Sequence, residues 1–116
     1  MSGPGLFYIA DLRPEWVRRP CVTFWRPDFA GYAYPLSWSG RYDLATVLAR
    51  WDYLTKQDNR WAIRFPISCE IVDAMAVATP PKIVDGDAGP VVLNTAANRA
   101  ALRADRYVCT NRAVAR

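Results

Sequence analysis

The chain has 116 residues, of which 52% are hydrophobic, 13% aromatic and 22% charged, and it carries a formal net charge of +4 without any histidine. This length and composition predict one globular domain over residues 1–116, because most domains have about 100 to 150 residues and disordered chains are poorer in apolar residues. The lack of histidine excludes Ser-His-Asp and Cys-His catalysis and histidine-based zinc sites. No apolar run has the roughly 18 residues of a membrane helix and no signal-peptide pattern occurs, so a soluble, unexported protein is expected.

The first part of the chain consists of short extended segments. Two apolar runs, over residues 6–12 and 21–25, are bounded by prolines and predict two β-strands. Residues 26–31 have the proline, aspartate and glycine chemistry of a turn, and a third extended segment follows over residues 32–36. The second and third strands are therefore expected to form a hairpin, with Pro35 marking an edge strand or a bend.

The middle of the chain predicts a helix, a strand and a second helix. Asp43 is a good N-cap for an amphipathic helix over residues 44–54, in which apolar residues recur at three- and four-residue spacing. Residues 61–65 alternate large apolar with small or charged side chains, as a half-buried strand does. Ser68 can cap a short helix over residues 69–78, although the β-branched residues in this segment also allow a strand.

The last part of the chain begins with the one long irregular region, rich in proline and glycine, over residues 80–90. Residues 91–93 are a short strand candidate, and Asn94 or Thr95 can cap a final helix that ends near residue 104. The resulting order of elements has too few βαβ units for a doubly wound sheet. We therefore predict an α+β fold: a small, mainly antiparallel sheet of about four strands with two or three helices on one face.

The cysteines and paired carboxylates give little sign of chemistry. Cys21, Cys69 and Cys109 are widely spaced and odd in number, which indicates free, buried or half-buried thiols in a reducing compartment. Glu70 and Asp73 would share a helix face, where they could hold a divalent cation or form a solvated edge. There is no glycine-rich phosphate motif, so we expect neither an enzyme nor a cofactor nor a bound metal.

The excess positive charge belongs to the end of the chain. Residues 1–98 hold ten basic and ten acidic side chains, whereas residues 99–116 hold five arginines against Asp105 alone. This basic C-terminal segment could bind nucleic-acid phosphates or an acidic protein face, or it could keep the chain soluble. The candidate nucleic-acid-binding residues are Arg99, Arg103, Arg106 and Arg112.

The densest aromatic feature spans residues 25–42, which contain six of the fifteen aromatic side chains. Aromatic rings interleaved with arginine can stack bases or form an interface hot spot, but a small domain also needs aromatic residues for its core. Alternation predicts that Tyr32, Tyr34 and Leu36 face the core. The residues expected to be exposed and to bind a partner are Arg26, Trp38, Arg41 and Tyr42.

The segment from Phe24 to Tyr42, read as F-W-R-P-x-x-x-G-Y-x-x-x-L-x-x-x-G-x-Y, resembles small uncharacterised proteins encoded by bacteriophages and prophages. The resemblance spans most of residues 6–104. It implies a small accessory protein in the cytoplasm of the bacterial host cell, with no catalytic residues to carry over. In that context the leading hypothesis is a protein that binds and inhibits a host protein or ribonucleoprotein, with an antiviral defence complex such as a CRISPR effector as the natural target (an anti-CRISPR role).

The charge distribution limits how such an inhibitor could act. A DNA mimic must be strongly acidic, which this chain is not. Blocking would instead use the aromatic and arginine patch against a protein subunit, or competition for guide RNA or target DNA. The alternative hypothesis is a nucleic-acid-binding or nucleotide-sequestering module, in which the same rings stack on bases and the basic C-terminal segment binds phosphates.

Overall fold

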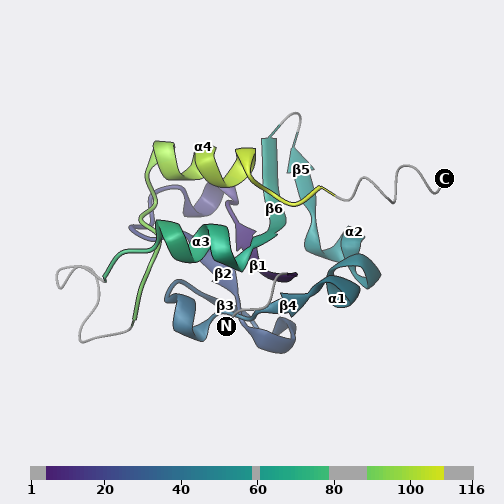
Figure 1. Cartoon of the computed structure of the whole chain (residues 1–116). Coiled ribbons are helices and arrows are strands. Elements are labelled where there is room, and N and C mark those ends of the chain that lie inside the picture. Colours follow the sequence, from purple (N-terminus) through teal and green to yellow (C-terminus); the bar gives the residue numbers. More distant parts are fainter. Residues whose placement is uncertain (1–4, 59–60, 79–88, 109–116) are drawn as a thin grey trace.

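The computed structural model of the chain describes residues 5–58, 61–78 and 89–108, and a six-stranded sheet organises these parts (Figure 1). Strand β1 (Leu6–Asp11) lies at the centre of the sheet. It pairs with β6 along one of its edges and with both β2 and β4 along its other edge. Strand β3 extends the sheet beyond β2, and β5 extends it beyond β6. All of these described pairings are antiparallel, and the other strands are β2 (Thr23–Trp25), β3 (Tyr32–Ala33), β4 (Tyr42–Asp43), β5 (Lys56–Asp58) and β6 (Trp61–Ser68).

Strand β1 is apolar on both faces, and this explains its central position. Its side chains alternate, so Tyr8 and Ala10 point to one face while Phe7 and Ile9 point to the other, and all four are buried. A strand that is buried on both faces needs covering layers on both sides. The expectation that the helices lie on one face is therefore wrong.

Four α-helical segments in the described parts of the chain cover the two faces of the sheet. Helices α3 (Cys69–Met75) and α4 (Ala96–Ala104), the longest two, contribute Val72 and Leu102 to the core around Tyr8. Helices α1 (Leu44–Ala49) and α2 (Trp51–Leu54) contribute side chains to the second core, around Phe7. None of the helices in the described ranges is long and apolar enough to cross a bilayer.

Two of the three predicted helix caps are confirmed; Ser68 stands at the N-cap position of α3, but its side chain makes no capping hydrogen bond. The Asp43 carboxylate accepts a 2.8 Å hydrogen bond from the Thr46 amide at the start of α1. The Thr95 hydroxyl accepts a 3.1 Å hydrogen bond from the Asn98 amide at the start of α4. The helix predicted over residues 44–54 is interrupted at Arg50, which leaves α-helical geometry and separates α1 from α2.

The sheet has more strands than the four or so predicted, because β4 and β5 were not expected. Both are only two or three residues long and exist because a longer strand lies beside them. Strand β6 continues through Pro66, whose carbonyl accepts a 2.8 Å hydrogen bond from the Tyr107 amide on the outer edge of the sheet. Residues 91–93 form isolated bridges to Val77 and Cys21 and not a strand of the sheet. The irregular region predicted over residues 80–90 lies mostly outside the described residues.

Candidate functional site

The four residues predicted to form one exposed partner-binding patch are separated by the fold. Trp38 is 50% exposed, and the Arg26 guanidinium lies 5.3 Å from its ring centroid. Arg41 is exposed but lies elsewhere, with its Nη2 3.6 Å from a carboxylate oxygen of Asp73 on α3. Tyr42 is only 6% exposed, so its predicted exposure is wrong: β4 pairs with β1 and turns this ring into the core.

Polar contacts also hold the buried Tyr42 in place. Its hydroxyl donates a hydrogen bond to the Arg26 carbonyl and accepts one from the Phe29 amide. Of the residues predicted to face the core, Leu36 does so. Tyr32 is instead exposed, and its ring contacts Trp16 and Trp25 edge-on.

A buried carboxylate organises the opposite end of β1. Asp11 is only 2% exposed, and its Oδ2 accepts a 2.8 Å bond from Arg13 Nη2 and a 3.2 Å bond from Trp25 Nε1. The Arg13 guanidinium also lies 3.8 Å from the Trp16 ring centroid. Hydrogen bonding to Asp11 raises the pKa of Arg13. This arginine is therefore committed to the fold, not free to bind a ligand.

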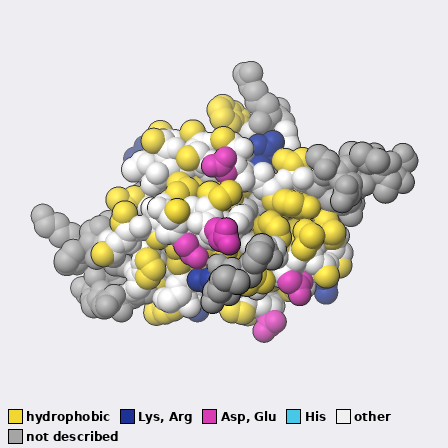
Figure 2. Space-filling model, viewed as in Figure 1, with side chains coloured by type: hydrophobic (Ala, Val, Ile, Leu, Met, Phe, Trp, Pro, Cys, Tyr) yellow, Lys and Arg dark blue, Asp and Glu magenta, His cyan; other side chains and the backbone are white. Residues whose placement is uncertain are grey.

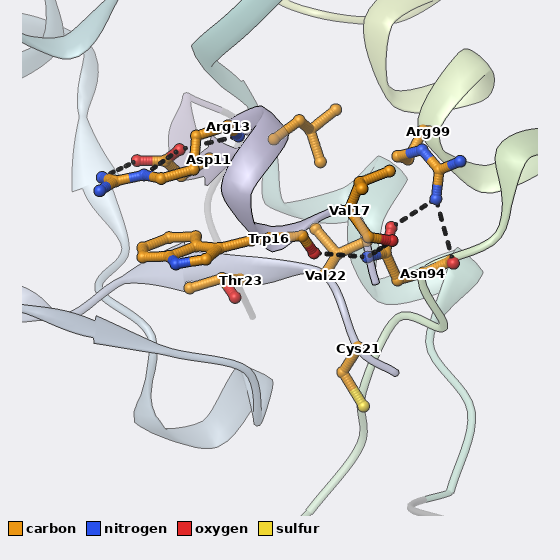
Figure 3. A pocket seen from close by; sticks show the side chains of 10 residues that line it. Asp11, Arg13, Trp16, Val17, Cys21, Val22, Thr23, Asn94 and Arg99 are labelled. Carbon is orange, nitrogen blue, oxygen red and sulfur yellow. Dashed lines mark hydrogen bonds and ion pairs between the residues drawn. The ribbon is translucent and has the colours of Figure 1, made fainter. Parts of the chain in front are cut away.

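Asn94 connects this region to α4 (Figure 3). Its Nδ2 donates hydrogen bonds of 3.1, 3.2 and 2.8 Å to the carbonyls of Trp16, Val17 and Arg19, just after the 3₁₀ turn η1 (Pro14–Trp16). Arg99 Nη1 in turn donates a 2.8 Å bond to Asn94 Oδ1 and a 3.1 Å bond to the Asn94 carbonyl. The enclosed cavity in Figure 3 has a volume of about 10 Å³, which is room for one water molecule and no larger ligand.

A larger cleft opens between α4 and η1, and we call it the α4 cleft. Its volume of about 300 Å³ is at the lower end of the range for small-molecule sites. Trp61, at the start of β6, is 57% exposed and lies in this cleft. Figure 2 shows dark blue side chains beside yellow ones where the end of α4 meets the start of β6. The lining residues are Leu12, Pro14, Val17, Asp58, Trp61, Ile63, Arg99 and Arg103.

Two arginines and one aspartate, Asp58, line the α4 cleft, which leaves it with a net positive charge. Arg99 and Arg103 are one helical turn apart on α4, so their guanidinium groups share a face. Arg103 Nε donates a 2.9 Å bond to the Ala62 carbonyl, and its guanidinium lies 5.2 Å from the Trp61 ring centroid. Burial, and next the neighbouring Arg99, lower the pKa of Arg103. The ion pairs among the described residues involve neither arginine, so a bound anion would relieve their mutual repulsion.

The structure thus brings together part of the predicted nucleic-acid-binding set. Arg99 and Arg103 line the α4 cleft, while Arg106 follows α4 and donates a 2.6 Å bond from Nη1 to the Arg103 carbonyl. Arg112 lies outside the described residues. Sequence reasoning missed Trp61, which it placed in a half-buried strand; the polar run just before this tryptophan was the signal that could have indicated an exposed end.

The described thiols are buried and unreactive. Cys21 and Cys69 are free and buried, as predicted, and Cys109 lies outside the described residues. Burial raises the pKa of Cys69 to about 12 and also raises the pKa of Cys21. Almost no thiolate is therefore present at neutral pH, and neither thiol is poised as a nucleophile.

The carboxylate pair on α3 is not arranged as a metal site. Asp73 accepts a 2.6 Å hydrogen bond from the Tyr8 hydroxyl, and burial together with this bond raises the pKa of Tyr8. Glu70 is exposed. No group of three or more His, Cys, Asp or Glu side chains that could hold a metal ion occurs within the described ranges.

No protein-family model matches the chain, and no significant match was found among curated proteins or solved structures. Function is therefore inferred from the chemistry of the chain's own residues. In the α4 cleft, a pair of guanidinium groups suits phosphate or carboxylate, and an exposed indole ring suits another planar ring. A nucleotide unit carries both kinds of group.

Proposed function

We propose that this protein is a non-enzymatic, single-strand nucleic-acid-binding module, in which the α4 cleft holds a base against Trp61 and phosphates at Arg99 and Arg103. The observation that supports it is the placement of two arginines without a described carboxylate partner beside an indole ring that is 57% exposed. The net charge of +4, concentrated in residues 99–116, favours the same ligand.

The proposal specifies single strands because of how stacking works. A base can stack on a side chain in a cleft only when it is splayed out of a duplex, and such stacking contributes roughly 1–3 kcal/mol per base. Phosphate contacts from arginine add affinity without sequence preference. The expected ligand is therefore single-stranded DNA or RNA, bound with little sequence specificity and with a strong dependence on salt.

The test is fluorescence anisotropy with a labelled oligothymidylate in low and moderate salt. Trp61→Ala and the double variant Arg99→Gln/Arg103→Gln should both weaken binding. The double variant Arg26→Gln/Arg41→Gln is the matched control for the arginine pair, because it also removes two positive charges, from positions outside the α4 cleft. Absence of binding by the parent chain in low salt, or equal weakening by the control, would contradict the proposal.

A second candidate function is inhibition of a host protein, as the resemblance to bacteriophage proteins implies. The observation that favours it is the exposed Trp38 ring with the Arg26 guanidinium lying over it, since tryptophan and arginine are enriched in interface hot spots. Binding to a purified antiviral complex such as a CRISPR effector would be measured by surface plasmon resonance. Trp38→Ala should abolish it and Trp61→Ala should not; the reverse result would reject the Trp38 surface.

A further inference from the structure

A second basic cleft lies next to the α4 cleft, and the proposed function does not use it. We call it the Arg64 cleft; its volume is about 190 Å³. Its lining includes three cationic side chains and three aromatic rings, and no aspartate or glutamate among the described residues lines it. These six side chains are Lys56, Arg64, Arg106, Trp51, Phe65 and Tyr107.

Arg64 is half-buried, whereas the other two cations that line this cleft are exposed. Its Nε is buried and has no hydrogen-bond partner, and its guanidinium lies 5.2 Å from the Trp25 ring centroid. A buried donor without a partner is costly, and in native proteins it commonly marks a place where a water, ion or ligand is needed. Asp11 lies directly opposite Arg64 in the β1–β6 pairing, but it does not line the cleft, and its Oδ2 already accepts hydrogen bonds from Arg13 and Trp25.

The two clefts lie on opposite faces of β6, beside its pairing with β5. Trp61 and Arg64 lie on opposite faces of this strand because side chains alternate, so each cleft belongs to one face of the β5–β6 hairpin. Arg103 Nε donates a hydrogen bond to the Ala62 carbonyl of β6. Ala62 lies opposite Gln57 of β5, where the register of the β5–β6 pairing shifts between Lys56 and Gln57.

The chain after α4 follows the edge of β6 from one face to the other. Tyr107 donates its amide hydrogen to the Pro66 carbonyl at the edge, and its ring packs against Phe7 in the core on the side of α1 and α2. Arg106 Nη1 contacts the Arg103 carbonyl on the way. The series Arg99, Arg103 and Arg106 therefore connects the α4 cleft to the Arg64 cleft.

We propose that the Arg64 cleft is a second phosphate-binding site for the same ligand, so that one single strand runs from the α4 cleft past Arg103 and Arg106 into the Arg64 cleft. This inference rests on the proposed function and deepens it, because it makes the ligand an oligonucleotide and not a mononucleotide. Phosphates at Lys56, Arg64 and Arg106 would supply the counter-charge that no described carboxylate provides in this cleft.

The salt dependence of binding measures the number of phosphates contacted. For single strands, the slope of log affinity against log salt is about −0.7 for each phosphate neutralised. Contacts at Arg99 and Arg103 alone predict a slope of about −1.4, whereas contacts at all five cations predict about −3.5. The double variant Lys56→Gln/Arg106→Gln should reduce the magnitude of the slope by about 1.4 for long strands.

The experiment combines strand length, salt and charge. Oligothymidylates and oligouridylates of about two to about twelve nucleotides, a range that covers typical single-strand site sizes, are titrated by anisotropy against the full chain. Lys56→Gln/Arg106→Gln should leave dinucleotide affinity unchanged and lower the affinity for the longest strands by about fivefold or more. The control Arg26→Gln/Arg41→Gln removes the same charge from outside both clefts, and circular dichroism checks that every variant is folded.

The failures of the two proposals can be told apart. If no oligonucleotide of any length binds in low salt, the proposed function fails and this inference fails with it. Only the second site is overturned if strands bind through Trp61 but their affinity does not rise with strand length. The same holds if Lys56→Gln/Arg106→Gln and the control Arg26→Gln/Arg41→Gln change the affinity equally. Equal binding of polyglutamate, or of duplex DNA, would overturn the single-strand path.

Discussion

Two arginine–tryptophan pairs in this fold have opposite surroundings. The Arg13 guanidinium lies 3.8 Å from the Trp16 ring centroid, and that of Arg103 lies 5.2 Å from the Trp61 ring centroid. Arg13 is neutralised by the buried Asp11 at 2.8 Å, whereas Arg103 faces an open cleft and has another cation, Arg99, as its neighbour. The same pair of residue types thus stabilises the fold in one place, and in the other it lines the cleft that we propose binds a ligand; the bonded carboxylate partner distinguishes the two.

The largest effect is expected from Asp11→Ala. It leaves the Arg13 guanidinium and the Trp25 indole N–H without their acceptor, and breaking a buried pair costs about 3–5 kcal/mol. Because the Arg13 side chain is 27% exposed and can be hydrated, we expect a loss of about 3 kcal/mol in the free energy of unfolding, measured with urea. Asp11→Asn retains an acceptor oxygen and should lower the free energy of unfolding by less. A loss below about 1 kcal/mol for Asp11→Ala would contradict the structural role of the Arg13–Trp16 pair.

Trp61→Ala should affect binding and not stability. Loss of one stacked base corresponds to roughly 1–3 kcal/mol of binding free energy, or a fall in oligonucleotide affinity of about five- to a hundredfold. The free energy of unfolding should change by less than about 1 kcal/mol, because the ring is mostly exposed. Trp61→Phe should retain most of the affinity. A stability loss as large as that of Asp11→Ala would instead place Trp61 among the structural residues.

The single variants Arg99→Gln and Arg103→Gln should each reduce the salt slope of oligonucleotide binding by about 0.7. Arg13→Gln removes the same charge from the other pair, and it should leave the slope unchanged in salt titrations of the folded protein. If Arg13→Gln reduces the slope as much as Arg103→Gln, net charge and not position governs binding.

The smallest effect concerns Asp43, an exposed carboxylate that contrasts with the buried Asp11. Its hydrogen bond from the Thr46 amide lowers the pKa of Asp43. The resulting stabilisation is complete above the unfolded-state pKa of about 3.9 and is lost as the pH falls through the lower folded-state value. Urea midpoints measured from about pH 5 down to about pH 3 should therefore fall less in Asp43→Asn, which keeps a cap without a titrating group. Parallel curves would show that this carboxylate contributes nothing.

Local chemistry explains which parts of the fold were predictable. The caps at Asp43 and Thr95 depend on residues within one turn, so sequence alone identified the first and limited the second to Asn94 or Thr95. Strands β4 and β5 are too short for a periodic pattern and form only because β1 and β6 lie alongside them. The helices on both faces had a signal that was overlooked: the start of β1 is a continuous apolar run, which is typical of a strand covered on both sides.

The candidate site was predictable only as far as its charge. The sequence places the excess positive charge in residues 99–116, and the structure puts Arg99 and Arg103 one turn apart on α4. The cleft itself depends on the η1 turn, which Asn94 holds against α4 through carbonyls more than seventy residues away in the chain. Tyr42 was misplaced for the same kind of reason, since its burial follows from a pairing with β1 that no local pattern shows.

The central position of β1 has a consequence for folding during synthesis. The strand emerges early, but its longest partner, β6, lies more than half the chain away, with Phe7 opposite Ser68. Until β6 is made, β1 keeps an unpaired edge and an apolar surface, a state that invites aggregation and chaperone binding. Such non-local pairing also slows folding. Because β6 lines both clefts, neither cleft can form before β6 has paired with β1.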